Sequence, residues 1–176
     1  MKTHVAAFLT VAVAAATALT GCTGNGTAGA PTPAVVQAGL CLDLDSALVT
    51  DAFASLGTAP GGDPWVPGTG SDAAGENCPA LLWATAETPG GTVSSPTQVL
   101  FFHDGTYLGT ATAESYAYTQ VVGSTDDSVS VEYRWLGEQD ANCCPSGGPA
   151  VVTYSWDGSR VVMEQPLPQE MLDSYK

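Results

Sequence analysis

Positive charge is nearly absent from this sequence of 176 residues. Four lysines and arginines stand against 18 aspartates and glutamates, which gives a formal net charge of −14 at pH 7. Proteins that bind nucleic acid neutralise phosphates with clustered Lys and Arg, so this composition argues against a nucleic-acid partner. Anionic lipid head groups would repel the chain as well, and we interpret the acidic excess mainly as a source of solubility.

Histidine is almost as rare, and this limits the chemistry to be expected. Outside the N-terminal segment the sequence contains only His103, in FFHDGTYL. A catalytic histidine needs a nucleophile and an orienting acid within hydrogen-bond reach. Asp104 belongs to an Asp-Gly pair, no G-x-S-x-G motif occurs, and Ser95 is one of several serines that no motif singles out. We therefore predict that the chain is not an enzyme and that His103 is a structural or surface residue.

Two similar stretches, FFHDGTYL and YSWDGSRV, each place Asp-Gly between strand-like runs. A two-residue type I′ turn requires positive φ at both central residues, which Asp-Gly pairs favour. Both stretches are therefore predicted hairpins, in which His103 and Trp156 end the incoming strands. Alternation along the strand places His103 on the face of Val99 and Phe101, with Thr106 as its cross-strand neighbour.

Long apolar runs are confined to the N-terminus. Lys2 precedes an apolar and small-residue run from Val5 to Ala18, and the sequence Leu-Thr-Gly-Cys follows, ending at Cys22. This order is typical of a bacterial lipoprotein signal with its lipobox. We predict that residues 1–21 are a signal peptide and that Cys22 is acylated by a diacylglycerol with chains such as palmitate. Two such chains give stable anchoring, so we expect the protein on the outer, extracytoplasmic face of the cell membrane.

Composition divides the remaining chain. Residues 22–38 consist of small residues, Gly and Pro without charge after the cysteine, and we predict a flexible lipidated tether there. A coil of that length would reach about 20–25 Å. We expect residues 39–168 to form one folded domain and residues 169–176 to be a C-terminal tail.

Four cysteines follow Cys22, at positions Cys41, Cys78, Cys143 and Cys144. An even number in an exported protein predicts two disulfides. One pairing joins Cys41 to Cys78 and the two neighbours to each other, which requires a strained ring because adjacent α-carbons lie closer than disulfides prefer. The other two pairings tie both Cys41 and Cys78 to the vicinal cysteines. No Cys-x-x-Cys spacing or histidine pair is present, so we predict neither a metal site nor a cofactor.

The predicted domain begins with one helix in CLDLDSALVTDAFASLG. Apolar residues recur at every fourth position from Leu44 to Leu56. Asp43 or Asp45 can cap the first turn, and Gly57 can end the helix.

A Gly- and Pro-rich loop is expected at residues 57–77. Its one large apolar side chain is Trp65, which we expect to fold onto the core. Trp65 and His103 are also weak candidates for ligand recognition, because amphipathic rings often anchor interfaces.

The rest of the chain shows the alternation of antiparallel strands. In VSVEYRW the residues from Val129 to Trp135 place apolar side chains on one face and polar ones on the other, and VVTYSW alternates similarly. The expected strands cover residues 80–87, 97–103, 106–112, 118–123, 128–136, 149–156 and 159–164. We predict an α+β domain in which a single N-terminal helix packs on a mainly antiparallel meander sheet.

Five stretches between Asn77 and Pro168 have a further significance: NCPALLWA, VLFFHDGTYLGTATAESYAYTQVV, DDSVSVEYRWL, DANCCPSGGPAVVTYSWDGSRVV and the closing PLP. Together they resemble the LppP/LprE lipoproteins of actinobacterial cell envelopes. The resemblance implies an exported, membrane-anchored protein without an assigned reaction, cofactor or catalytic residue. It gives a role to Cys22 alone.

Three hypotheses for function follow. The first is a non-enzymatic envelope lipoprotein whose domain binds an unknown envelope protein or lipid, with the membrane itself contacted through Cys22. The second is a carrier of a lipid or small apolar molecule, because a curved sheet with aromatic inward faces can enclose a cavity. The third and least favoured is a hydrolase that uses His103 as its base.

Overall fold

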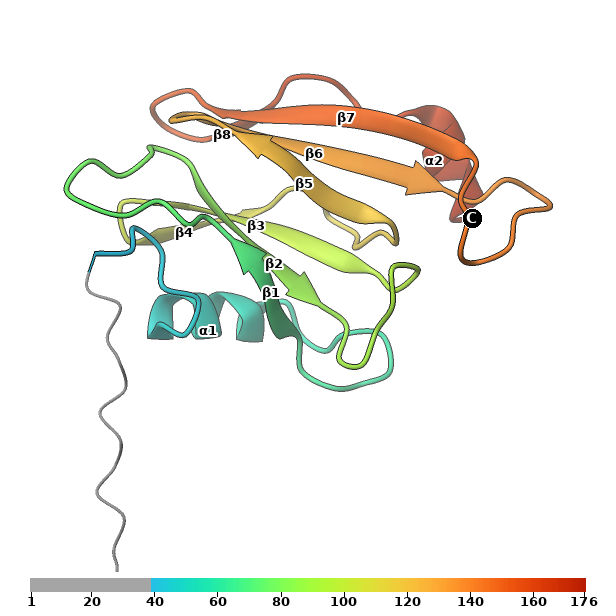
Figure 1. Ribbon diagram of the computed structural model, residues 1–176, viewed down its shortest axis with the longest axis horizontal. Helices are drawn as coiled ribbons and strands as arrows, with labels where there is room; N and C mark the ends of the chain where they lie inside the picture. Colours follow the sequence, from blue (N-terminus) through green and yellow to red (C-terminus); the bar gives the residue numbers. More distant parts are fainter. Residues whose placement is uncertain (1–38) are drawn as a thin grey trace, which may run out of the picture. The chain divides into compact units, whose positions relative to one another are not determined.

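This computed structural model describes residues 39–176 of the chain (Figure 1). These residues contain eight strands and two short helices, joined by turns and loops. The predicted signal peptide, the tether and Cys22 lie outside these residues. The strands form two four-stranded antiparallel sheets, each a meander in chain order. The first sheet contains β1 (Val66–Gly70), β2 (Leu82–Glu87), β3 (Thr97–His103) and β4 (Thr106–Thr110), and the second contains β5 (Thr119–Ser124), β6 (Ser128–Trp135), β7 (Gly147–Trp156) and β8 (Val161–Met163).

The predicted strands are confirmed, but their division into two sheets differs from the one sheet that we expected. β3 coincides with the predicted range, and β2 and β4 to β8 overlap the other six. The physical reason lies in β3, whose five central residues are all buried. A strand in a sheet with one wet face alternates buried and exposed side chains. β3 is covered on both faces instead, by the second sheet on one side and by α1 (Ala47–Ser55) on the other.

The core between the sheets is aromatic. Phe101 of β3 packs on Tyr154 of β7 with ring centroids 5.2 Å apart. The hydroxyl oxygen of Tyr154 lies 2.8 Å from that of Tyr133 on β6, so each buried phenol has a hydrogen-bond partner. All three rings are at most 2% exposed. The inward faces predicted from alternation therefore pack against each other as a filled core.

A second core lies between α1 and the other face of the first sheet. Leu100 and Phe102 alternate along β3 with the residues of the first core and pack in the same cluster as Val49 and Phe53 of the helix. Figure 1 shows α1 lying beneath the first sheet, on the side away from the second. Because both cores include β3, this strand is the centre of the fold.

The helix begins later than predicted and at a different cap. Ser46 is the N-cap, and its hydroxyl accepts a hydrogen bond from the backbone N–H of Val49 at 3.4 Å. The carboxylate of Asp43 accepts a hydrogen bond from the backbone N–H of Asp45, so both aspartates belong to the preceding turn. Gly57 has a φ of +76°, as expected for a residue that ends a helix.

The segment predicted as a C-terminal tail is part of the fold. Gln169–Ser174 form α2, so the prediction of a single helix is wrong. Met171 is fully buried in the core between the sheets, and the partly buried Leu172 packs against the same core. A helix this short gains little from its own hydrogen bonds and is stabilised by such packing, which a periodic sequence pattern does not register.

Both disulfides are formed, in the first of the three pairings that the sequence left open. Cys41 bonds to Cys78, with α-carbons 5.5 Å apart, and Cys143 bonds to its neighbour Cys144. The first bond links the segment before α1 to the segment before β2. A backbone hydrogen bond from Cys41 N–H to the oxygen of Ala73, 2.8 Å long, holds the same two segments together.

The two disulfides are expected to differ in their effect on stability. Loop-closure entropy predicts that Cys41→Ser/Cys78→Ser lowers the free energy of unfolding by about 3–4 kcal/mol, because this bond closes a 37-residue loop. The bond between Cys143 and Cys144 closes almost no loop. The variant Cys143→Ser/Cys144→Ser should therefore lower the free energy of unfolding by about 1 kcal/mol or less. Urea unfolding of the two double variants without reductant measures the difference. An equal loss in both would contradict this assignment of the bonds.

The paired tyrosines make stability depend on pH in the alkaline range. Burial raises the pKa of Tyr133 above its ordinary value of 10.0, and it raises the pKa of Tyr154 to about 12. Above about pH 10 the unfolded chain loses these phenol protons while the folded chain keeps them, so the free energy of unfolding falls as pH rises. The fall is at most about 1.4 kcal/mol per pH unit for each tyrosine.

Denaturant unfolding at a series of alkaline pH values tests this linkage. The double variant Tyr133→Phe/Tyr154→Phe should show a flatter decline above about pH 10 than the unchanged protein, because the two paired core phenols can no longer ionise on unfolding. The same decline in both proteins would assign the pH dependence to other groups.

Candidate functional site

His103 occupies the turn position that the sequence predicted. Asp104 and Gly105 have φ of +43° and +69°, and His103 pairs with Thr106 across the hairpin. Nδ1 of His103 lies 2.6 Å from the backbone oxygen of Ala80, to which it donates when it carries the proton. The half-buried ring is engaged on one edge by this contact.

The same ring stacks on Trp156 of the second sheet, with centroids 4.4 Å apart. The two strand-ending residues that the sequence analysis compared are therefore in contact. The second hairpin differs from the prediction: Asp157 has an ordinary φ, and its carboxylate accepts hydrogen bonds from the backbone N–H groups of Ser159 and Arg160 in a longer loop. These side-chain bonds hold Asp157 outside a type I′ turn.

Ser95, the serine considered as a nucleophile, lies before the first residue of β3, whereas His103 is its last residue. The strand that separates them, Thr97–His103, by itself spans about 20 Å. The hydrolase hypothesis thus has no support from this pair.

His103 is expected to contribute to stability. His103→Ala removes a ring stack and a hydrogen bond, each of which is worth about 0.5–1.5 kcal/mol. We predict that the free energy of unfolding drops by about 1–3 kcal/mol, and that His103→Phe, which keeps the stack, loses about half as much. Equilibrium urea unfolding measures both. A neutral effect of the alanine variant would contradict the contacts described here.

Trp65 also lies where the sequence predicted, against the core. It precedes β1, which interrupts the expected loop at 57–77. The ring packs on the cluster that contains α1, and its indole nitrogen is buried without a hydrogen-bond partner among the described residues. Trp65 therefore serves mainly in packing, and its position gives no indication of a bound ligand.

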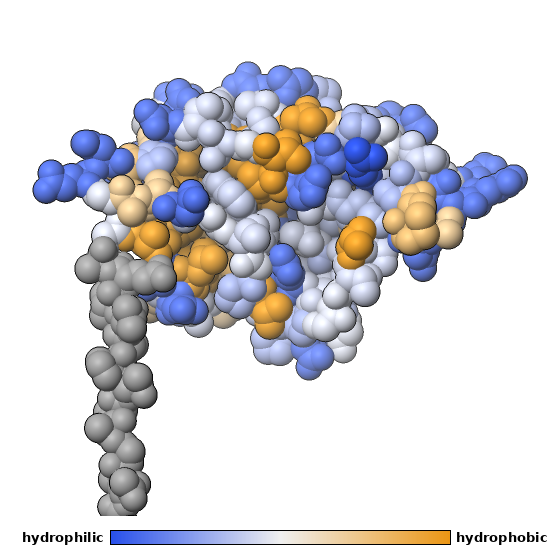
Figure 2. Space-filling model, viewed as in Figure 1, coloured by the Kyte–Doolittle hydropathy of each residue, from blue (hydrophilic) through white to orange (hydrophobic). Residues whose placement is uncertain are grey.

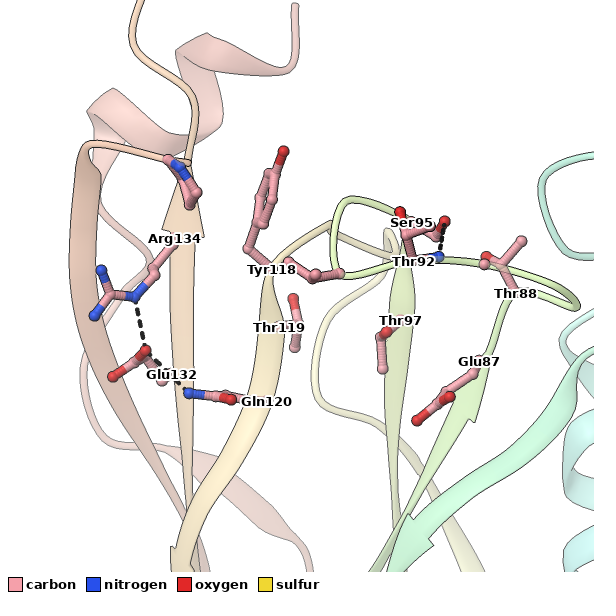
Figure 3. A pocket seen from close by; sticks show the side chains of 13 residues that line it. Glu87, Thr88, Thr92, Ser95, Thr97, Tyr118, Thr119, Gln120, Glu132 and Arg134 are labelled. Atoms are coloured by element: carbon pink, nitrogen blue, oxygen red, sulfur yellow. Dashed lines mark hydrogen bonds and ion pairs between the residues drawn. The ribbon is translucent and has the colours of Figure 1, made fainter. Parts of the chain in front are cut away.

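A polar groove of about 570 Å³ lies where β5 of the second sheet faces the ends of β2 and β3 in the first (Figure 3). Its volume is within the range of about 300–1,000 Å³ typical of small-molecule sites. Hydroxyl, amide, carboxylate and guanidinium groups predominate in its lining. The lining residues are Glu87, Thr88, Gly91, Thr92, Val93, Ser95, Thr97, Tyr118, Thr119, Gln120, Glu132, Arg134 and Pro145.

One wall of the groove carries a connected row of three planar polar groups. Glu132 Oε1 accepts a hydrogen bond from Arg134 Nε at 2.9 Å and another from Gln120 Nε2 at 3.2 Å. Register explains the row, because Gln120 and Glu132 are paired on adjacent strands and Arg134 follows two positions along β6. Figure 3 shows the two bonds, with Thr119 standing beside them on β5.

The opposite wall comes from the first sheet. Glu87 and Thr97 are cross-strand partners at the ends of β2 and β3. In the loop between these strands, Thr88 donates its hydroxyl proton to the backbone oxygen of Pro96 at 2.8 Å, and Ser95 Oγ accepts from the backbone N–H of Thr92 at 2.9 Å. These bonds fix the loop hydroxyls in place.

The two walls are joined by the chain that leads into β5. The N–H of Thr97 bonds to the oxygen of Tyr116, and the N–H of Tyr118 bonds to the oxygen of Val93, at 3.0 and 3.1 Å. Tyr118 has a φ of +53°. A bulky residue in this region costs of order 1–3 kcal/mol, and such strain concentrates at functional sites. The hydroxyl of Tyr118 donates to the oxygen of Asn142, beside the vicinal disulfide, at 2.6 Å.

Sequence reasoning missed this groove. The alternation of VSVEYRW correctly assigned Glu132 and Arg134 to the outer face, where polar side chains usually meet only solvent. One signal was present: Arg134 is among only four basic residues, and it stands two positions from an acid on the same face. Nothing in the pattern indicated that Glu87 and Thr97 would lie opposite.

Large apolar side chains reach the surface at separated positions. The face in Figure 2 shows hydrophobic patches interrupted by polar surface. Among residues 39–176, no helix is long and apolar enough to cross a membrane, and no group of three His, Cys, Asp or Glu residues is arranged to hold a metal ion.

Comparison with known proteins identifies the segment that contains the groove. Residues 76–159 match the family described as LppP/LprE lipoprotein. This segment is therefore similar to the LppP/LprE lipoproteins. Every lining residue of the groove lies within it, whereas α1, β1 and α2 lie outside.

Relatives of the LppP/LprE type cover a larger part of the chain. The chain is 33% identical over 110 residues to proteins named "Putative lipoprotein LppP" from Mycobacterium bovis and Mycobacterium tuberculosis. The match covers 61% of this chain and 61% of each relative, so it spans about three fifths of the relatives' length. No solved structure is significantly similar to the chain.

Proposed function

We propose that this chain is an exported lipoprotein, acylated at Cys22 and held on the outer face of the cell membrane, whose folded domain binds a component of the cell envelope in the polar groove. The lipobox and the LppP/LprE relationship support the anchor. The groove carries the binding proposal, because it is a preorganised polar site on a rigid two-sheet body.

The side chains in the groove favour binding over catalysis. None of the lining residues is a histidine or cysteine. Glu132 Oε1 accepts hydrogen bonds from both Gln120 and Arg134, so this carboxylate oxygen is occupied by groups of the protein itself. We therefore propose a non-enzymatic binding role.

The carrier hypothesis has no comparable support. Its cavity was expected behind the aromatic inward faces, but Phe101, Tyr133 and Tyr154 pack together there. A lipid chain also needs a mostly apolar lining, which the polar groove does not provide.

Membrane attachment through Cys22 is tested by Cys22→Ser. The anchor contributes about 0.8 kcal/mol for each buried methylene, and the acidic domain adds no attraction to anionic head groups. We expect the unchanged protein to sediment with membranes and the variant to be released or to remain as unprocessed precursor, which intact mass distinguishes. A processed serine variant that still sediments would contradict the proposed anchor.

Use of the groove is tested by photo-crosslinking on living cells. A benzophenone amino acid replaces exposed Gln120 in the full-length protein, and the matched control replaces Asp51, exposed on α1 at the other side of the first sheet. We expect a defined adduct from position 120 that is absent from position 51. Equal adducts from both positions, or none from position 120, would contradict binding in the groove.

A further inference from the structure

We infer that the groove binds an uncharged, polyhydroxylated ligand, a short segment of a glycan chain. This inference rests on the proposed binding role and adds the chemical class of the ligand. It depends on three properties of the lining: its charge, its hydroxyl groups and the placement of its few apolar side chains.

The charge of the lining disfavours ionic ligands. Arg134 is the one basic residue in the groove, and its Nε is already bonded to Glu132. Glu87 on the opposite wall leaves the site with one excess negative charge, in a strongly acidic chain. Phosphate and carboxylate ligands would therefore meet repulsion, since they are usually held by several basic groups. A single excess carboxylate is also a weak basis for selecting cations.

The hydroxyl groups of the lining match a ligand whose groups both donate and accept hydrogen bonds. Five of the lining residues are Ser or Thr, and each hydroxyl has one donor and two acceptor sites. Two of the five already donate their hydroxyl proton within the protein. Thr88 donates to the backbone oxygen of Pro96, and Thr119 donates to the backbone oxygen of Tyr116. Their lone pairs are thus preset as acceptors for ligand hydroxyls.

The planar row on the second sheet supplies the complementary donors. Gln120 has a second amide proton, and the guanidinium of Arg134 has further N–H groups beyond the Nε bond to Glu132. Side-chain exposures of 40% for Arg134 and 14% for Glu132 leave the donor accessible while the acceptor that orients it is largely covered. Planar amide and guanidinium groups carry two N–H donors side by side. Two neighbouring hydroxyls of a sugar ring can each accept one hydrogen bond from such a group.

Large apolar or aromatic side chains are a minority of the lining and come from three different segments. Val93 is 68% exposed at the rim, and Pro145 and Tyr118 contribute from two other segments. A sugar ring has C–H surface interleaved with hydroxyls, so it can contact such separated groups. An acyl chain would need them to be continuous.

Binding of neutral oligosaccharides to the full-length protein in detergent tests the inference by isothermal titration calorimetry. The probes are short gluco-, manno-, galacto- and arabino-oligosaccharides, with galacturonate oligosaccharides as the charged counterpart of the galactose series. We expect at least one neutral probe to bind and the galacturonate to bind more weakly than its neutral counterpart. Failure of every neutral probe, or preference for the galacturonate, would overturn the inference.

Matched variants show whether binding occurs in the groove. Thr97→Val removes a lining hydroxyl without changing side-chain shape, and Thr153→Val makes the same change on β7 outside the groove. We expect Thr97→Val and Arg134→Met to weaken binding about three- to tenfold, the loss of one hydrogen bond, with Thr153→Val unchanged. Equal affinities in all variants would overturn the inference.

The outcomes separate this inference from the proposed function. If no neutral probe binds but crosslinking at position 120 captures a defined partner, the glycan inference fails and the binding role stands. If position 120 gives no specific adduct and no probe binds, both fail. Recovery of shortened probe would support the glycan class and contradict the non-enzymatic role.

Discussion

Burial of β3 on both faces is the constraint on which the rest of this structure depends. Alternate side chains of this strand belong to two different cores: Val99 and Phe101 pack toward the second sheet, and Leu100 and Phe102 pack toward α1. A displacement of the strand by one residue would exchange these sets and disrupt both cores at once. The register of β3 is therefore strongly specified, and with it the position of everything attached to its two ends.

The two ends of β3 have different roles as a result. At its last residue, the His103 ring contacts the second sheet through Trp156 and closes that end of the sandwich. At its first residue, Thr97 bonds through its backbone to Tyr116 and presents its side chain in the groove. The sheets are held at a fixed separation by packing, so the groove is a rigid feature and not a gap between mobile parts. Rigidity of this kind reduces the entropy that binding must overcome.

Local features of the fold could be predicted from the sequence because they depend on neighbours in the chain. Alternation located the strands, Asp104-Gly105 set the first hairpin, and the even cysteine count predicted two disulfides. Alternation also identified which face of β6 is buried, but it cannot say what covers that face. Two sheets and one sheet give the same pattern in such strands, whereas burial of consecutive residues, as in β3, distinguishes them.

The elements that sequence reasoning missed depend on distant contacts. β1 contains one proline and two glycines, which have low strand propensity, and it pairs with β2 through a register shift. α2 is six residues long and depends on the burial of Met171. The groove is the extreme case: its walls come from strands of different sheets, and its outward Glu132 and Arg134 have the ordinary appearance of a solvated face. The two walls come together only through the tertiary fold, so a local sequence pattern does not indicate that they face each other.

Amide hydrogen exchange tests the central claim that this rigid groove is the surface that engages the cell envelope. The full-length protein is compared in isolated envelope fragments and after extraction into detergent. Binding in the groove predicts slower exchange in the envelope sample at the free edge of β5 and in the loop between β2 and β3, with α1 unchanged. Slower exchange at α1 instead, or identical exchange throughout the folded domain, would contradict the account.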